Sequence, residues 1–343
     1  MNPEWQLFLE RSGARFLEDG RVQRFGDAKA ELEAARSGSV MAALSQLSIL
    51  GFTGEDAGTF LHGQLSCDVQ GLESARSTFG SFMSPKGRML ANFLLWRDGD
   101  RFEMVLSASL AAAIRKRLTQ FVLRSKVRIV DDDERIALIG AAGPGAPGAL
   151  SALFSGLPAG EHEAHYRPEL GSVIRFGQDR FLVAILASEA PMVWANLAGE
   201  LRAVGTPCWE WLDIRNGVPW ITAATQEQLL PQMANLELLG GVSFNKGCYP
   251  GQEIVARSRY LGQVKRRMFL LNSSERPVEG DALYSEEFGD QASGLIVNVQ
   301  ESPDGGYDAL AVVQTSGLDR DSVRLKSLGG PKVRFLAMPY PVP

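Results

Sequence analysis

The chain has 343 residues, of which 45% are hydrophobic and 22% are charged, and its formal net charge is -5 with a pI near 5.5. This length suggests two or three domains and provides enough apolar sequence for buried cores. The acidic balance argues against a globally basic nucleic-acid binder, and no apolar run approaches the about 18 residues that a membrane helix needs.

The cysteines and the N-terminus indicate a compartment. Three cysteines, Cys67, Cys208 and Cys248, are too few and too scattered for a disulfide framework or a zinc site. Free thiols suit a reducing environment. Residues 1–5 contain no basic region followed by an apolar stretch, so we expect no secretory signal. The sequence therefore predicts a soluble, cytoplasmic protein.

The first 60 residues predict a short lead-in followed by a strand and a helix. Residues 1–40 mix charged and apolar positions, which is typical of a short helix with a loosely packed connection. Residues 45–52 are apolar enough for a buried strand. Thr53 and Asp56 have the spacing of a capping box, which predicts a helix that carries Phe60.

The next segment predicts a hairpin, a helix and further strands. Residues 76–82 and 88–96 flank the turn 84–87, which contains proline and glycine. Ser109 is placed to cap an amphipathic helix over residues 110–123. Additional strands are expected at residues 101–106, 127–130 and 136–139. Strands interspersed with isolated helices indicate the α+β class and not a regular βαβ succession.

A glycine-rich segment at residues 143–148 matches the letters GxGxxG without matching its chemistry. A dinucleotide fingerprint uses free backbone N–H groups to meet pyrophosphate, and Pro144 and Pro147 have none. We therefore expect a connection between a strand and a helix here.

After residue 265 the pattern changes to short strands separated by turns that are rich in glycine, aspartate and serine. Closely spaced strands without helices suggest a small β-barrel. The expected strands are residues 268–271, 282–284, 294–299, 309–313 and 333–337.

Residues 246–253 (KGCYPGQE) are the most informative stretch of the chain. Glycine and proline favour a loop of defined shape, and Cys248 lies inside it. Lys246 could lower the pKa of this thiol and enlarge its reactive thiolate fraction. Alternatively, the loop is a tight turn whose cysteine only packs.

Residues 230–257 (LPQMANLELLGGVSFNKGCYPGQEIVAR) resemble the signature of the YgfZ family, folate-binding proteins related to the T-protein of the glycine cleavage system. The likeness extends from about residue 40 to 268. Four further segments occur in the expected order: 60–69 (FLHGQLSCDV), 84–89 (SPKGRM), 125–135 (SKVRIVDDDER) and 209–214 (WEWLDI). The resemblance implies two interwoven α+β folate-binding domains within residues 1–265, the inserted one at about 53–135, and a small β-barrel at 266–343.

The resemblance also implies site residues. Trp209 would lie along the folate pocket, whereas the residue pattern alone favours a core aromatic residue that anchors a helix. The catalytic aspartate of the T-protein should fall at Ala91 or Asn92, and neither can act as a carboxylate. Arg215 replaces a carboxylate that would contact the pterin. Asn92 and Arg215 are thus candidate folate contacts, and Asn92 could instead be a satisfied strand residue.

The implied function is that of a folate-binding protein, with tetrahydrofolate or a derivative as cofactor, that maintains iron–sulfur clusters. Cys248 would be the functional thiol, without a resident metal, and the rest of the signature loop comprises Lys246, Gly247, Tyr249, Gly251, Gln252 and Glu253. Effects on tRNA modification would be indirect. The alternatives are a tetrahydrofolate-dependent aminomethyl- or methyltransferase and a scaffold that does not use folate.

The implied partners are folate and iron–sulfur proteins or cluster carriers, and the chain is expected to be a monomer. Basic residues cluster between positions 246 and 267, but only Tyr249 and Tyr260 could stack on bases there. Direct tRNA recognition is therefore not expected.

Overall fold

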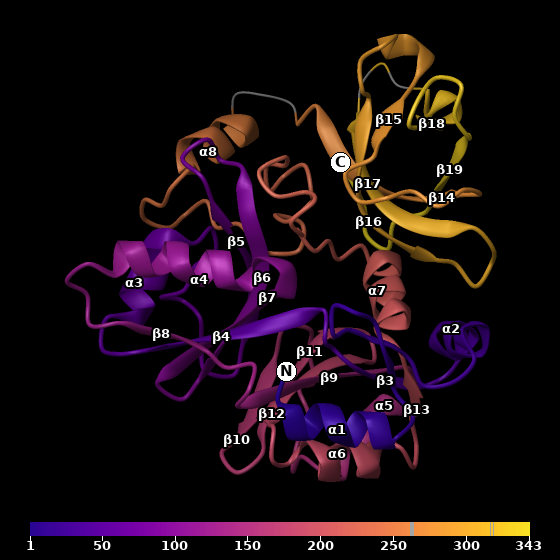
Figure 1. The fold of residues 1–343 in the computed structure, drawn as a ribbon. Coiled ribbons are helices and arrows are strands. Elements are labelled where there is room, and N and C mark those ends of the chain that lie inside the picture. Colours follow the sequence, from indigo (N-terminus) through magenta and orange to yellow (C-terminus); the bar gives the residue numbers. More distant parts are fainter. Residues whose placement is uncertain (261–263, 316, 318) are drawn as a thin grey trace. The chain divides into compact units, whose positions relative to one another are not determined.

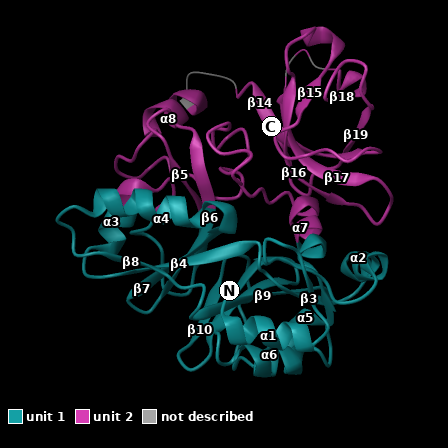
Figure 2. Cartoon of the chain, in the orientation of Figure 1, with its two compact units in different colours: residues 1–61, 69–78, 93–209 teal, residues 62–68, 79–92, 210–343 magenta. Residues whose placement is uncertain are grey.

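A computed structural model describes residues 1–260, 264–315, 317 and 319–343 (Figure 1). The chain forms two compact units, each built from several segments (Figure 2). Unit 1 comprises residues 1–61, 69–78 and 93–209, and unit 2 comprises residues 62–68, 79–92 and 210–343. The division at residue 265, with an insertion at 53–135, stays a prediction.

A six-stranded sheet in unit 1 has the order β10-β11-β12-β9-β3-β13. All of its pairs are antiparallel except β3 with β13, which is parallel. The strands are β3 (Val40–Ala43), β9 (Ile136–Ala142), β10 (Ala164–Arg167), β11 (Gly171–Gly177), β12 (Arg180–Leu186) and β13 (Arg202–Val204).

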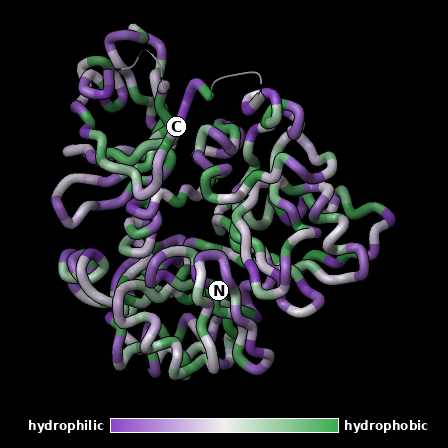
Figure 3. Tube along the Cα trace, turned by 180° about the vertical axis from the view of Figure 1, so that it is seen from behind, coloured by the Kyte–Doolittle hydropathy of each residue, from purple (hydrophilic) through white to green (hydrophobic). Residues whose placement is uncertain are grey.

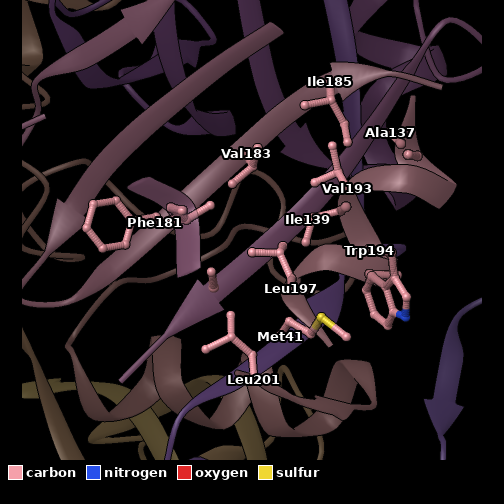
Figure 4. Packing of buried hydrophobic residues seen from close by; sticks show 14 of the residues in the cluster. Met41, Ala137, Ile139, Phe181, Val183, Ile185, Val193, Trp194, Leu197 and Leu201 are labelled. Carbon is pink, nitrogen blue, oxygen red and sulfur yellow. The ribbon is translucent and has the colours of Figure 1, made fainter. Parts of the chain in front are cut away.

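Three helices cover one face of this sheet: α1 (Pro3–Arg11), α5 (Ala146–Ser151) and α6 (Ala190–Leu197). Alternate residues of the strands face these helices, as the period of two in a strand requires. Figure 4 shows Ile139 and Val183 from the sheet together with Val193 of α6 in this core. The apolar face of each helix is therefore buried against the sheet.

The glycine-rich segment 143–148 connects β9 to α5, so the expected connection between a strand and a helix is confirmed. The N–H of Gly145 donates to the Ser39 hydroxyl at 2.8 Å. One glycine is required for close packing, because a Cβ on Gly143 would lie 2.2 Å from the carbonyl oxygen of Gly38.

A five-stranded sheet has the order β5-β6-β7-β4-β8. Its strands are β4 (Leu47–Thr53), β5 (Ser77–Met83), β6 (Met89–Asp98), β7 (Arg101–Ser107) and β8 (Arg128–Asp131). Helix α4 (Ala108–Val122) buries Leu110, Ile114 and Leu118 on one face. The predicted hairpin, the helix and the neighbouring strands are thus confirmed.

Both predicted helix caps are wrong. Thr53 ends β4 and pairs with Arg128, and α3 (Ala57–Gln64) begins only after Asp56. The Asp56 carboxylate accepts the N–H of Lys126 at 2.7 Å, so a distant segment replaces the local cap. In α4, Ser107 occupies the cap position and makes no side-chain capping hydrogen bond, while Ser109 lies inside the first turn.

The C-terminal part of unit 2 is a curled, antiparallel six-stranded sheet of the order β18-β15-β16-β17-β14-β19. The two edge strands of this sheet are β18 and β19. Hydrogen bonds from Leu325 N to Pro331 O and from Val333 N to Val323 O connect the chain at these edges. These few bonds do not pair β18 and β19 along their length, so the expected barrel takes the form of a half-barrel. Its strands are β14 (Arg266–Ser273), β15 (Ala282–Tyr284), β16 (Gly294–Glu301), β17 (Tyr307–Gln314), β18 (Arg324–Leu325) and β19 (Val333–Leu336).

The remaining elements are short. They are β1 (Arg15–Phe16), β2 (Val22–Arg24), α2 (Ala28–Ser37), α7 (Thr206–Arg215), α8 (Gln252–Tyr260) and two 3-10 turns, Glu286–Phe288 and Arg320–Ser322. Hydrophobic and hydrophilic stretches alternate along the whole trace (Figure 3). Among the residues that the structure describes, no helix is long and apolar enough to cross a membrane.

Candidate functional site

Residues 246–251 form a loop in unit 2 that leads directly into α8. Cys248 is exposed in this loop, whereas Cys67 and Cys208 are 1% and 4% exposed. Burial raises the pKa of each of the two interior thiols to about 12, so both remain protonated. Cys67 is a packing residue. The accessible thiol of the chain is therefore that of Cys248.

Lys246 is directed into unit 2, away from solvent. Its ammonium group donates hydrogen bonds to the carbonyl oxygens of His62, Leu65 (2.6 Å) and Cys67 (2.9 Å). Its Nζ atom also lies 4.9 Å from the ring centroid of the buried Tyr249. Burial lowers the pKa of Lys246 to about 8. The lysine thus holds together backbone segments that are far apart in the sequence.

Gly251 brings the signature loop against the turn at residues 84–87. Its φ of +82° is a left-handed conformation that favours glycine. A Cβ at this position would lie 2.7 Å from Gly87 Cα and 2.8 Å from the Ser84 carbonyl oxygen. Two of the motifs recognised in the sequence therefore meet in unit 2, through backbone atoms.

The last residues of the signature begin α8. The Gln252 side chain donates to the Lys246 carbonyl oxygen at 3.4 Å, which closes the loop, and Glu253 is exposed in the first helical turn. At the other end of α8 the Arg259 guanidinium lies 3.9 Å from the ring centroid of Phe244. The first contact holds the start of α8 against the loop, and the second holds the end of α8 against Phe244, which precedes the loop.

Asn92 is 1% exposed and its amide makes two hydrogen bonds to the backbone. Its Nδ2 donates to Pro219 O at 2.7 Å, and its Oδ1 accepts the N–H of Ile221 at 2.7 Å. The side chain therefore pairs with the 219–221 segment as a strand would.

Arg215 lies beside a buried carboxylate that the sequence analysis missed. Its Nη1 is 3.6 Å from Asp308 Oδ2, and Asp308 is 1% exposed. Asp308 also accepts hydrogen bonds from Trp211 Nε1 (3.0 Å), Asn272 Nδ2 (2.9 Å) and Ser302 Oγ (3.1 Å). An aspartate in the otherwise apolar strand β17 was the available signal for this network.

Trp209 belongs to unit 1 and is 1% exposed. Its ring lies 6.0 Å from that of Phe176, and the guanidinium of Arg180 lies 5.0 Å from its centroid. A Cβ on Gly140 would approach the indole to 2.4 Å, so glycine is needed there. These are the contacts of a core aromatic residue, and a folate contact stays a prediction. Sequence reasoning also missed Arg180, a 3% exposed cation in an apolar strand.

Within the described ranges, no group of three or more histidine, cysteine, aspartate or glutamate side chains is arranged to hold a metal ion. The candidate site thus consists of the exposed Cys248 thiol in a loop that is held by Lys246 on one side and by Gly251 on the other.

Comparisons with known proteins identify the family and the fold of the chain. Residues 8–167 match the model of the GCVT N-terminal domain. The chain is 32% identical over 312 residues to the tRNA-modifying protein YgfZ of Escherichia coli O127:H6 (strain E2348/69), and the match covers 89% of this chain and 94% of the relative. YgfZ of Escherichia coli strain SMS-3-5 matches with the same identity and coverage.

Among solved structures, the chain is similar to aminomethyltransferase T of the glycine cleavage system from Bartonella henselae. The TM-score is 0.80 with 19% sequence identity, over 96% of this chain and 95% of the other. At this identity the similarity shows the fold, and it confirms the expected architecture of T-protein type. On the identity and coverage shared with its bacterial relatives, the chain belongs to the YgfZ family.

Proposed function

We propose that this protein binds a reduced folate and acts in the assembly, repair or maintenance of iron–sulfur clusters. Family membership over 89% of the chain carries the proposal. The relatives are named tRNA-modifying proteins, and an effect on tRNA modification would follow indirectly from modifying enzymes that depend on such clusters. The cofactor is tetrahydrofolate or a derivative.

Cys248 is the proposed functional thiol, and Trp209, Asn92 and Arg215 are the proposed folate contacts. The exposure of Cys248 supports a chemical role, because an accessible thiol can meet iron, a disulfide partner or a one-carbon unit. Folate and iron–sulfur proteins or cluster carriers are the proposed partners of a monomeric, cytoplasmic protein.

Replacing Trp209 tests the folate contact. Trp209→Ala should weaken the binding of 5-formyltetrahydrofolate by about 1–3 kcal/mol, the range for losing a large aromatic contact. Calorimetric titration of the purified protein measures this loss. Because Trp209 is buried, Trp209→Phe serves as a second variant that keeps much of the core packing. Unchanged affinity in both variants, with circular dichroism showing a folded protein, would remove Trp209 from the site.

The runner-up function, a tetrahydrofolate-dependent aminomethyltransferase, is tested by direct assay. We expect no turnover above background with tetrahydrofolate and an aminomethyl-lipoyl carrier protein. The reason is chemical: Ala91 and Asn92 occupy the expected carboxylate position, and the Asn92 amide is bonded to the backbone. Bartonella henselae aminomethyltransferase T is the positive control. Turnover at an ordinary enzymatic rate would contradict the proposal and favour the transferase.

A further inference from the structure

The signature loop has two inward-directed side chains that flank an outward-directed one. Lys246 and Tyr249 are wholly or partly buried and contact each other, whereas Gly247 and Cys248 between them are exposed. The backbone between the two inner residues must therefore pass along the surface, with the thiol on its outer side.

The acceptors of Lys246 explain why a lysine occupies this position. His62 is in the last turn of α3, where carbonyl oxygens lack partners within the helix, and Leu65 and Cys67 follow the helix end. A cation is favoured at the C-terminal end of a helix. An ammonium group is compact and has three donors, which matches three converging carbonyl oxygens. The planar guanidinium of arginine lacks this geometry.

The titratable groups around Lys246 are His62, Cys67 and Asp68 at the end of α3, together with Tyr249 of the loop itself. His62 Nδ1 lies 3.2 Å from Asp68 Oδ1, and burial together with the positive charge of Lys246 lowers the pKa of the imidazole. The three hydrogen bonds of Lys246 are directed at the backbone of residues 62–67. The charge of Lys246 therefore lies at this backbone, among three carbonyl oxygens.

We propose that Lys246 is a positioning residue, which ties the signature loop to the C-terminal end of α3 and thereby holds Cys248 at the surface. This inference rests on the proposed role of Cys248. It replaces the interpretation drawn from the sequence, in which Lys246 activates the thiol by its charge.

The test uses the full chain carrying Lys246→Met or Lys246→Arg, with Lys332→Met as the matched control. Lys332 is an exposed lysine of unit 2 whose side-chain accessibility is 55%. Three readouts are compared: amide hydrogen exchange, the pH dependence of Cys248 alkylation by iodoacetamide, read by mass spectrometry, and complementation of cells that lack the protein.

For Lys246→Met we expect amide exchange at residues 62–67 and 246–251 to become about tenfold faster. The midpoint of the alkylation profile should stay that of the wild type, and complementation should be lost. Lys246→Arg should restore the slow exchange only in part, and Lys332→Met should match the wild type in every readout.

Two results would overturn the inference. One is a midpoint shifted to higher pH in Lys246→Met with unchanged amide exchange, which would make Lys246 the charge partner of the thiol. The other is unchanged exchange with full complementation. If Cys248→Ser itself complements, the proposed function of the thiol fails, whereas the exchange measurement still decides whether Lys246 orders the loop.

Discussion

Cys248→Ser should leave the protein folded and yet fail to restore the activities of iron–sulfur enzymes in cells that lack it. Serine nearly preserves the volume of cysteine but is a much weaker nucleophile and metal ligand, so the change removes chemistry and keeps packing. Because Cys248 is exposed, its replacement removes no core contact. The readout is the activity of cluster-dependent enzymes in extracts, together with the melting temperature of the purified variant.

The matched control is Cys208→Ala, which removes a buried thiol and should complement as long as it folds. Thiol-reactive probes should label Cys248 faster than either Cys67 or Cys208 in the native protein, since the latter are sealed from solvent. Full complementation by Cys248→Ser would show that the cysteine of the signature is architectural.

The second large effect is a loss of stability on replacing Gly251, where the backbone of the signature loop packs against the turn at residues 84–87. Gly251→Ala should lower the free energy of unfolding by about 2–4 kcal/mol, because it combines a left-handed φ with a backbone overlap. The added Cβ would meet Gly87 Cα at 2.7 Å and the Ser84 carbonyl oxygen at 2.8 Å, and neither is a flexible side chain that can move away. Urea denaturation of the purified variant measures the loss.

Gly247→Ala is the control in the same loop. A Cβ there would have no atom within 4 Å, and the residue is exposed, so we expect a change within about 0.5 kcal/mol. Equal stability of the two variants would mean that the loop does not depend on its contact with the 84–87 turn.

The parts of the fold that could be predicted from sequence are those set by local patterns. Alternating apolar residues and glycine-containing turns located β5, β6, β14, β16 and β17 to within a few residues. The cap at Ser109 was misplaced because α4 already begins at Ala108. The capping box at Thr53 failed because a tertiary partner was involved: the Asp56 carboxylate accepts the N–H of Lys126. Such a partner lies too far along the chain for a spacing rule to find.

The candidate site shows the same limit. The signature loop was recognised because its residues are contiguous. Residues 246–251 do form a loop, and Cys248 is exposed in it. Local sequence did not indicate the hydrogen-bond acceptors of Lys246, because they are carbonyl oxygens about 180 residues earlier in the chain. Likewise, nothing in the local sequence around Arg215 or Trp209 indicates Asp308 or Arg180 as a neighbour.

The hydrogen bonds of Asn92 determine whether this position of the chain could carry a carboxylate. An aspartate there would present a second carboxylate oxygen to the Pro219 carbonyl in place of the N–H that now donates to it. Two acceptors would then face each other in a buried place, which is costly. An ionised aspartate at position 92 would therefore require the 219–221 segment to change at the same time. The identity of residue 92 is thus coupled to a segment 127 to 129 residues further along the chain, so that neither can be exchanged independently of the other.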